Sequence, residues 1–342
     1  MITLKMLAET LGVSVSTVSK ALKDSPEISK DTIARVKEVA TQLNYKPNRL
    51  ALGLKNRKTR TIGVIIPNIL NHFFAKVLNG IEEEATKRGY NLITCISNES
   101  YQKEKESLEL LANGSVDGYI MSISEDTQRM DETRHFKDAM DENLPIVMFD
   151  RVANNVNCDK VVIDDFGAAF SATNVLLGEG RKNIVLINTL EEISVGKLRI
   201  LGYTNALEKS STYSGKPNVV NISKELEPLE GEIEKVLKNN KDIDALLCID
   251  NITGTIAIGV AQRLGIKVPE QLSIIGFTSD NMVHLTSPKL STVSQYGEEI
   301  GMESVNLLID RIENNDKSMH VIKTINYTLN LRGTTKAATL KK

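Results

Sequence analysis

The chain has 342 residues, too many for one ordinary hydrophobic core, so its length predicts two or three domains. Hydrophobic residues make up 41% and charged residues 25%, which is typical of a globular protein rather than a disordered one. The start, MITLKMLAET, lacks the apolar core and cleavage site of a secretory signal, and no stretch approaches the roughly 18 apolar residues of a membrane span. We therefore expect a cytoplasmic protein with no membrane partner.

The charge is unevenly distributed, although the net charge is only −2. Residues 1–60 carry twelve Lys and Arg against five Asp and Glu, a balance of +7. The remainder carries thirty against thirty-nine, a balance of −9. A basic segment attached to an acidic body indicates that one end of the chain contacts a polyanion.

The first 46 residues contain the pattern of three short helices. Apolar residues recur at helical spacing over 4–11, after Thr3, which is suited to cap the first turn, and Gly12 follows where a helix end favours glycine. Ser14 is placed to cap a second helix over 15–22, and a third begins near Ser29. Two short helices joined at a glycine, with a third packed against them, predict a helix-turn-helix module over residues 1–46.

Such a module places its second helix in the major groove of DNA. Lys20 is the candidate for reading a guanine through O6 and N7, Val15 suits a thymine methyl group, and Ser16 would lie near the bases. Thr17 and Ser19 are candidates for phosphate contacts. The alternative is an ordinary solvated face, but such faces more often carry mixed charges than small hydroxyl side chains. The candidates for DNA binding in this module are Thr3, Ser14, Val15, Ser16, Thr17, Ser19 and Lys20.

The N-terminal sequence resembles that of transcriptional regulators of the lactose-repressor (LacI/GalR) family. The resemblance rests on GVSVSTVSKAL, LNYKPN and TIGVIIP, and it continues through essentially the whole chain. It implies a ligand-responsive regulator, with repression as the expected mode, that binds double-stranded operator DNA of pseudo-palindromic sequence as a homodimer. A small-molecule effector is the implied second partner.

Residues 47–60 are predicted to form a hinge helix and linker. The segment RLALGL is one to two turns long, too short to be a stable helix alone in water. In the resembled family this segment folds on operator DNA, and a leucine, here Leu54, wedges a base step of the minor groove. Asn48, Arg49 and Lys55 complete the DNA-binding candidates, and the basic linker residues could equally be a solvated segment.

From residue 61 onward, short apolar runs alternate with amphipathic stretches, which predicts parallel sheets with helices on both faces. The expected strands cover 61–67, 91–97, 117–123, 145–150, 183–188, 245–250 and 272–277. The fold class is therefore α/β: an all-α head plus a periplasmic-binding-protein-like sensor of two Rossmann-like subdomains, with about six strands in each. The resemblance implies three crossings between them, and we expect subdomains of residues 61–161 with 292–325 and of 162–291 with 326–342.

Open parallel sheets bind ligands beyond the carboxyl ends of their strands, so we expect the effector between the two subdomains. The candidates at those strand ends are Phe73, Phe74, Asp150, Arg151, Asp250 and Thr278, and the resemblance adds Arg199. One phenylalanine could belong to the core instead, and Asp250 could cap the helix that follows it. Many sugar-responsive members carry an aspartate where this chain has Thr278, so the effector class stays open, with a sugar or sugar derivative among the candidates.

The sequence contains no P-loop, nucleophile elbow or HExxH helix, and its four histidines are scattered, so we do not expect an enzyme. Cys95, Cys158 and Cys248 lie far apart, so we expect reduced thiols, and neither a metal site nor a cofactor. Two alternatives remain. The regulator could respond to a phosphorylated carrier protein instead of a small molecule, or the chain could be a solute-binding protein, which would need export and no DNA-binding head.

Overall fold

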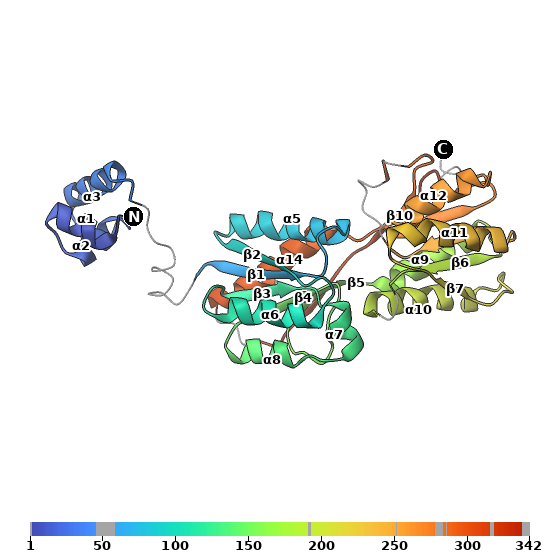
Figure 1. The fold of residues 1–342 in the computed structure, drawn as a ribbon, viewed down its shortest axis with the longest axis horizontal. Helices are drawn as coiled ribbons and strands as arrows, with labels where there is room; N and C mark the ends of the chain where they lie inside the picture. The colour runs from blue at the N-terminus through green and yellow to red at the C-terminus, as the bar shows by residue number, and fades with distance from the viewer. Residues whose placement is uncertain are drawn as a thin grey trace. The chain divides into compact units, whose positions relative to one another are not determined.

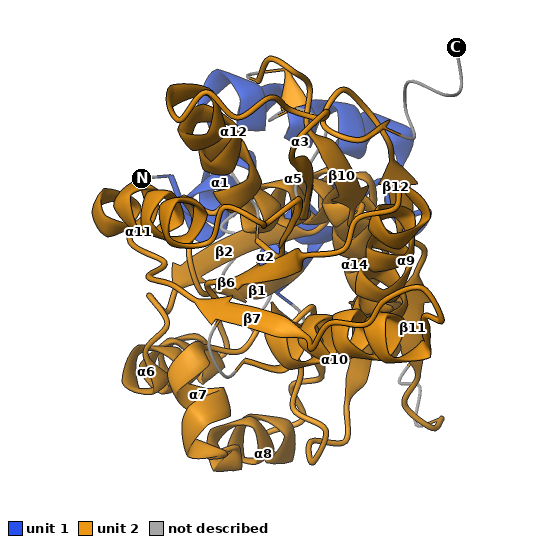
Figure 2. Ribbon diagram, turned by 90° about the vertical axis from the view of Figure 1, so that its right-hand side faces the viewer, with its two compact units in different colours: residues 1–59 blue, residues 60–342 orange. Residues whose placement is uncertain are grey.

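The structure is a computed structural model that describes residues 2–45, 59–190, 193–250, 252–277, 283–284, 286–314 and 318–336. It separates into two compact units, residues 1–59 and 60–342 (Figure 2). The predicted hinge residues Asn48, Arg49, Leu54 and Lys55, and Thr278 of the predicted effector site, lie outside the described residues.

The described part of the first unit contains α1 (Leu4–Leu11), α2 (Val15–Ala21) and α3 (Lys30–Gln42) (Figure 1). A hydroxyl side chain at the start of each helix, from Thr3, Ser14 and Ser29, accepts a backbone N–H of the first turn. These caps replace the partners that the first N–H groups of a helix lack. Gly12 ends α1 in the left-handed region, with φ of 66°. The three helices enclose a small core of Leu7, Ala8, Leu11, Val18, Ala21, Val36 and Ala40, as the helix-turn-helix prediction requires.

The second unit contains two six-stranded sheets in its described residues. The first, all parallel in the order β11-β5-β4-β3-β1-β2, consists of β1 (Thr61–Ile66), β2 (Asn91–Ile96), β3 (Gly118–Met121), β4 (Ile146–Phe149), β5 (Asp159–Ile163) and β11 (Ile322–Ile325). The second, in the order β12-β10-β9-β8-β6-β7, consists of β6 (Ile184–Asn188), β7 (Asn218–Asn221), β8 (Ala245–Cys248), β9 (Ser273–Phe277), β10 (Ser291–Ser294) and β12 (Thr328–Asn330). Only β12 runs antiparallel to its neighbour among these pairs.

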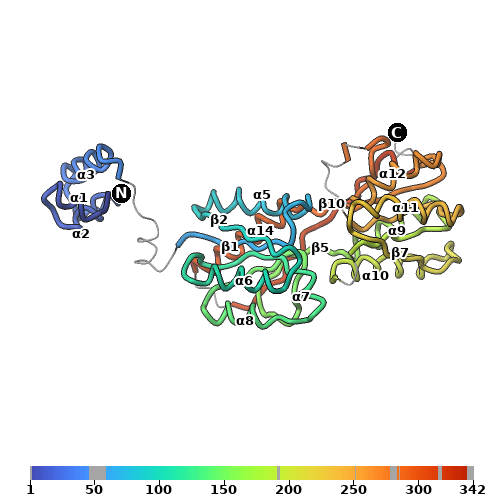
Figure 3. Tube along the Cα trace, in the orientation of Figure 1, coloured from blue at the N-terminus to red at the C-terminus, as the bar shows by residue number. Residues whose placement is uncertain are grey.

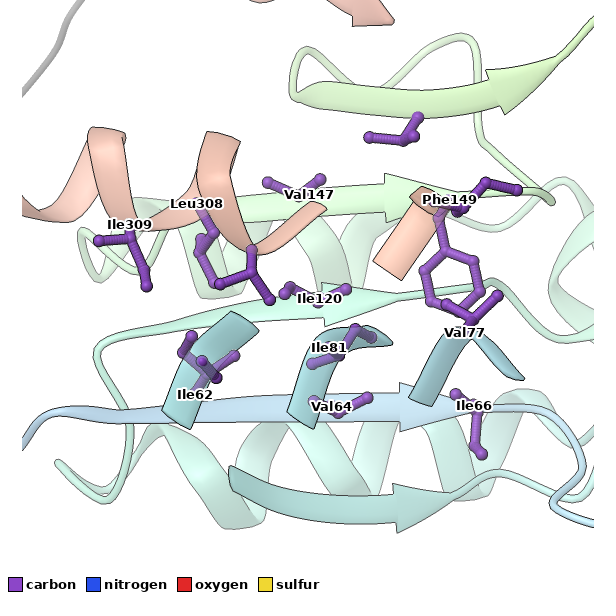
Figure 4. Packing of buried hydrophobic residues seen from close by; sticks show 14 of the residues in the cluster. Ile62, Val64, Ile66, Val77, Ile81, Ile120, Val147, Phe149, Leu308 and Ile309 are labelled. Carbon is purple, nitrogen blue, oxygen red and sulfur yellow. The ribbon is translucent and has the colours of Figure 1, made fainter. Parts of the chain in front are cut away.

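Helices cover both faces of the first sheet, and this sheet with its helices is called the first lobe. Helices α5 (His72–Lys87) and α14 (Gly297–Asn314) pack on the face that carries Ile62, Val64 and Ile66 (Figure 4). Helices α6 (Tyr101–Ala112) and α8 (Arg134–Asp141) pack on the opposite face, and α7 (Glu125–Met130) lies between them in the sequence. Successive side chains of a strand point to opposite faces, so a strand buried on both faces is apolar throughout, which explains runs such as TIGVII.

The second lobe repeats this arrangement around the second sheet. Helices α11 (Leu226–Asn239) and α12 (Thr253–Arg263) share one apolar core with the sheet, and α9 (Asp165–Gly178) and α10 (Ser194–Lys209) share the other. Among the helices within the described ranges, none has both the length and the apolar composition to cross a membrane.

The chain passes between the lobes after β5, after β10 and between β11 and β12, a path that can be followed in Figure 3. β5 still pairs with β11 at Ile163, and β10 stays between β9 and β12 up to Ser294. The first two crossings therefore come slightly later than the predicted positions 161 and 291, because both strands remain hydrogen-bonded beyond them. The third crossing lies between Ile325 and Thr328, next to the predicted position 325.

Close helix packing in the first lobe depends on two glycines. A Cβ atom on Gly80 of α5 would lie 2.1 Å from the carbonyl oxygen of Glu298, and one on Gly301 of α14 would lie 2.2 Å from that of Val77. In the second lobe, a glycine likewise allows two helices to pack closely, since a Cβ atom on Gly202 of α10 would lie 2.2 Å from the carbonyl oxygen of Phe166 on α9. Each contact brings two helix backbones together over the sheet.

We predict that Gly80→Ala lowers the free energy of unfolding by about 1–3 kcal/mol, because the added methyl group must displace α14. The matched control is Gly231→Ala on α11, where a Cβ atom would meet nothing within 4 Å. There alanine should raise the stability by about 0.5–1 kcal/mol through its greater helix propensity. Urea unfolding measures both values, and a Gly80→Ala protein as stable as the control would contradict the close approach.

Candidate functional site

The candidate DNA-binding surface is the exposed side of α2. Val18 and Ala21 are fully buried against α1 and α3, and this fixes the rotation of the helix. The opposite side exposes Val15, Ser16 and Lys20. An apolar side chain, a hydroxyl group and an ammonium group therefore share one solvent-facing surface, as the sequence predicted.

The hydroxyl groups at the start of α2 form one hydrogen-bonded cluster. The Ser14 hydroxyl accepts the Thr17 backbone N–H at 3.1 Å, and its Oγ lies 2.7 Å from Ser16 Oγ and 2.8 Å from Thr17 Oγ1. Thr3 has the corresponding capping role on α1, and Ser19 is half-buried. Thr3 and Ser14 thus have a structural function in capping, to which any DNA contact would be additional.

Lys20 forms an ion pair that the sequence analysis did not predict. Its ammonium group contacts the carboxylate of Glu27, in the segment between α2 and α3, and the Lys20 side chain is 48% exposed. An exposed pair of this kind contributes about 1 kcal/mol or less, so a nucleic acid can replace Glu27 at small cost. A second lysine of the head, Lys37 on α3, is paired with Asp24 at 2.6 Å and is 47% exposed.

Asp150 lies at the carboxyl end of β4 and is influenced by charges of both lobes. Its φ of 57° is in the left-handed region, which aspartate tolerates better than most residues. Burial and the negative charge of Asp165 raise the pKa of Asp150 to about 6, although the guanidinium groups of Arg151 and Arg199 act in the opposite direction. Because Asp165 and Arg199 belong to the second lobe, Asp150 marks a place where polar groups of the two lobes come close together.

Arg151 is buried beside Asp150 and is held by Glu99, which the sequence analysis missed. Nη1 of Arg151 donates to both carboxylate oxygens of Glu99, at 2.9 and 2.7 Å. The guanidinium group also lies over the ring of Phe74, 5.4 Å from its centroid. Within the described part of the chain, the buried Nε of Arg151 has no hydrogen-bond partner.

The two predicted phenylalanines have different environments. Phe74 is only 1% exposed and belongs to the core between α5 and the first sheet, where its ring meets the edge of Phe149. Phe73 is half-buried at the beginning of α5. Phe74 is thus the fully buried core residue, and Phe73, which is partly buried and packs against the same core, remains the candidate for ligand contact.

Arg199 is 4% exposed and forms the centre of a buried cluster in the second lobe. Its Nε and Nη2 both lie 2.7 Å from Oδ1 of Asp165, and its Nη1 donates to the carbonyl oxygen of Ile249 at 2.6 Å. The guanidinium group stacks on the ring of Phe277, 4.3 Å from the centroid. Burial raises the pKa of Asp165, and the charge of Arg199 opposes this shift. Asp165 directly follows Asp164, the N-cap of α9, and its own partner could not be inferred from the sequence.

Asp250 accepts hydrogen bonds at the start of α12, close to the capping role that the alternative interpretation proposed, although the N-cap position itself is Ile252. Its Oδ1 accepts the backbone N–H groups of Ile252 at 2.8 Å and Thr253 at 2.7 Å, and its Oδ2 accepts the hydroxyl groups of Thr189 and Thr253. A carboxylate has about four acceptor positions, so these bonds leave little capacity for a ligand. The geometry therefore favours a structural role for Asp250.

The described residues contain no group of histidine, cysteine and acidic side chains that could hold a metal ion. Cys158 and Cys248 are buried free thiols, and Cys95 is a half-buried one.

Comparison with known proteins covers both units. Residues 59–330 match a family model described as periplasmic binding proteins and sugar binding domain of LacI family, and residues 3–48 match one described as bacterial regulatory proteins, lacI family. The HTH-type transcriptional repressor PurR of Aliivibrio salmonicida (strain LFI1238) is 30% identical over 313 residues, which cover 92% of this chain and 93% of the relative.

Two solved structures show the same fold. The lac repressor dimer bound to operator and the anti-inducer ONPF superposes with a TM-score of 0.86 at 19% identity, over 98% of this chain and 99% of that one. A complex of the transcriptional regulator CelR with cellobiose gives a TM-score of 0.71 at 23% identity, over 98% and 100% of the two chains.

We predict that Asp150→Asn stabilises the protein near neutral pH. The native pKa of Asp150 is about 6 against 3.8 for the free side chain, so the native state binds this proton more tightly than the unfolded state. The resulting stability is fully present below the unfolded pKa and is lost as the pH rises through about 6. Asparagine avoids burying a negative charge and should raise the free energy of unfolding near neutral pH by about 1–3 kcal/mol, with little difference at about pH 4.

The control is Asp165→Asn, which leaves the buried guanidinium of Arg199 without its counter-charge and should lower the stability by about 3–5 kcal/mol. Urea unfolding at the two pH values measures both effects. An Asp150→Asn protein less stable than the wild type at neutral pH would contradict the prediction, because the ionised carboxylate of Asp150 would then stabilise the native state.

Proposed function

The chain belongs to the LacI family of bacterial regulatory proteins, so it is a DNA-binding transcriptional repressor with an effector-binding sensor, and on this basis we propose how it binds its partners. Two copies bind a pseudo-palindromic operator, each through its own α2. A small molecule held at the carboxyl ends of the two sheets controls this binding. Family membership confirms the resemblance and the fold class predicted from the sequence, and with them the prediction that the protein is not an enzyme.

The proposed DNA contacts follow from the exposed side of α2. Lys20 reads a guanine after exchanging its partner Glu27 for the base edge, and Val15 contacts a thymine methyl group. The hydroxyl groups of Ser16 and Thr17 bind the backbone or base edges at the start of the helix. In the hinge we propose that Leu54 wedges the minor groove, with Asn48, Arg49 and Lys55 on the flanking phosphates.

The proposed effector is a small molecule rich in hydroxyl groups, such as a sugar or sugar derivative. The observation that carries this proposal is the Asp150 carboxyl group at the end of β4, whose pKa is raised by burial and, to a smaller extent, by the negative charge of Asp165 in the other lobe. Hydroxyl donors from a ligand would stabilise its ionised form. Arg199 offers hydrogen-bond donors from the second lobe, and Phe73, Arg151 and Thr278 complete the proposed contacts. The CelR structure of similar fold contains cellobiose.

We predict that the full chain selects one pseudo-palindromic sequence from a library of random duplexes. Lys20→Ala should abolish the base preference at one position of each half-site, a loss of about 1–3 kcal/mol of discrimination. Lys37→Ala is the matched control, because this lysine is equally exposed and also paired with a carboxylate but lies on α3. It should leave the selected sequence unchanged. Enrichment of no sequence over random competitor would refute operator binding.

We predict that a member of a panel of mono- and disaccharides, with cellobiose and ribose included, raises the thermal unfolding temperature of the full chain. A ligand at a hundred times its dissociation constant stabilises the native state by about 2.7 kcal/mol. Its affinity should increase as the pH rises through about 6, because ligand hydroxyls bind the ionised Asp150. Asp150→Asn should remove the shift, and Asp138→Asn, an exposed change on α8, should not.

A panel without any shift would count against a hydroxyl-rich effector. It would favour control by a protein partner, such as a phosphorylated carrier, which needs no ligand between the lobes.

A further inference from the structure

Helix α7 of the first lobe makes direct contacts with the second lobe. Nε2 of Gln128 donates to the hydroxyl oxygen of Ser194 at 2.8 Å, and the backbone N–H of Ser194 donates to Oε1 of Gln128 at 3.1 Å. Three residues earlier, the carboxylate of Glu125 pairs with the ammonium group of Lys224 at 2.8 Å. One short helix thus contacts two separate segments of the other lobe. The two hydrogen bonds between Gln128 and Ser194 are called the amide clasp, and Glu125 forms the ion pair.

The amide clasp satisfies a helix end in the second lobe. Ser194 is the first residue of α10, and the residue before it, Ile193, has no side chain that can cap the helix. The first N–H groups of a helix have no partner within it, so they need an acceptor from elsewhere. Gln128 supplies such an acceptor from the other lobe. Separation of the lobes would expose this helix end, so the clasp favours the closed arrangement.

Two carboxylates, one fully buried and one partly buried, hold α7 in place within the first lobe. Glu104 is fully buried on α6. Its carboxylate accepts the Ser124 backbone N–H at 2.6 Å and the Thr127 hydroxyl at 2.5 Å, and it forms a third hydrogen bond, of 3.0 Å, with Nε2 of His135. Glu99 accepts the backbone N–H of Glu125 at 3.0 Å through Oε2. Both ends of this short helix's first turn are therefore fixed by acidic side chains from neighbouring segments.

Glu99 also connects α7 with the proposed effector site. The same carboxylate that accepts the N–H of Glu125 binds Arg151 through both oxygens. A movement of Arg151 therefore changes the position of Glu99, and Glu99 holds the start of the helix that contacts the second lobe. This chain of contacts leads from Arg151 through α7 to α10, which carries Arg199.

We propose that α7 is a latch that holds the two lobes together through Gln128 and Glu125, and that Glu99 is the residue that positions it. The latch deepens the proposed function, since it would set the lobe arrangement on which effector control rests. It acts in the protein without effector, so its operation can be measured without DNA and without a ligand.

The test is the distance between spin labels on the two lobes of the full chain, measured by pulsed electron paramagnetic resonance. The labels are attached at Asp138→Cys on α8 and Lys235→Cys on α11, both exposed, in a Cys95→Ser background because the other two thiols are buried. Excess unlabelled protein prevents distances between subunits from contributing. The unaltered latch should give one main distance.

Gln128→Ala should add a population at longer distance and raise the ratio of open to closed molecules about tenfold, which corresponds to about 1.4 kcal/mol. The matched control is Gln102→Ala, which removes an amide hydrogen bond of 2.8 Å to Glu106 within α6 and should leave the distances unchanged. Circular dichroism checks that both variants are folded. An unchanged distance distribution in the Gln128→Ala protein would overturn the latch.

The ion pair allows a reciprocal test. Glu125→Lys should open the lobes, and the exchanged pair Glu125→Lys with Lys224→Glu should restore the closed distance. Glu99→Ala should open the lobes as well, while Glu99→Gln should keep them closed, because its amide oxygen can still accept the N–H of Glu125. Failure of the exchanged pair to restore closure, or equal behaviour of the two Glu99 variants, would refute the assigned roles. If the protein selected no operator sequence, the proposed DNA binding would fail. The distances between the spin labels, and the latch that they test, would be unaffected by that result.

Discussion

The second-lobe half of the candidate site depends on one buried ion pair, that between Arg199 and Asp165. The pair joins α9 to α10, and the third bond of the guanidinium group, to the carbonyl oxygen of Ile249, adds the end of β8. Both side chains are 4% exposed, and removing either partner from such a pair leaves an uncompensated charge in the interior. Arg199 is therefore held rigidly before any ligand arrives, and a group positioned in advance loses little conformational freedom on binding.

Asp150 directly follows β4 and Asp250 lies two residues after the end of β8, so both follow parallel strands, yet their environments differ. Four donors from Thr189, Ile252 and Thr253 satisfy Asp250, whereas within the described chain no donor contacts the Asp150 carboxyl group, and its pKa is raised. Burying a carboxyl group without partners lowers stability, and proteins tolerate this mainly where the group has a function. This difference is the reason that Asp150, and not Asp250, is the proposed ligand contact.

The sequence was sufficient where a local rule determines the structure. The caps at Thr3, Ser14 and Ser29 and the apolar strands around β1 follow from a few neighbouring residues. It was insufficient where the partner is distant: Glu99 lies 52 positions from Arg151, and Asp165 lies 34 from Arg199. The short strands β5, β7, β10, β11 and β12 were not predicted, since their charged, serine, threonine and asparagine residues resemble loops. Phe73 and Phe74 could be distinguished only once α5 had been placed on its sheet.

The two lobes share a strand order, but they contribute differently to the proposed regulation. In the first lobe, Arg151 and α7 are bound to the same carboxylate, that of Glu99. In the second lobe, α10 accepts the contact from α7 at Ser194 and presents Arg199 one to two turns later. Because Gly202 brings α10 into close contact with α9, the helix is packed tightly, and a displacement of its first turn would be carried to the guanidinium group. In the proposed mechanism, lobe closure and effector contact thus act on the same helix, so a change in one would affect the other.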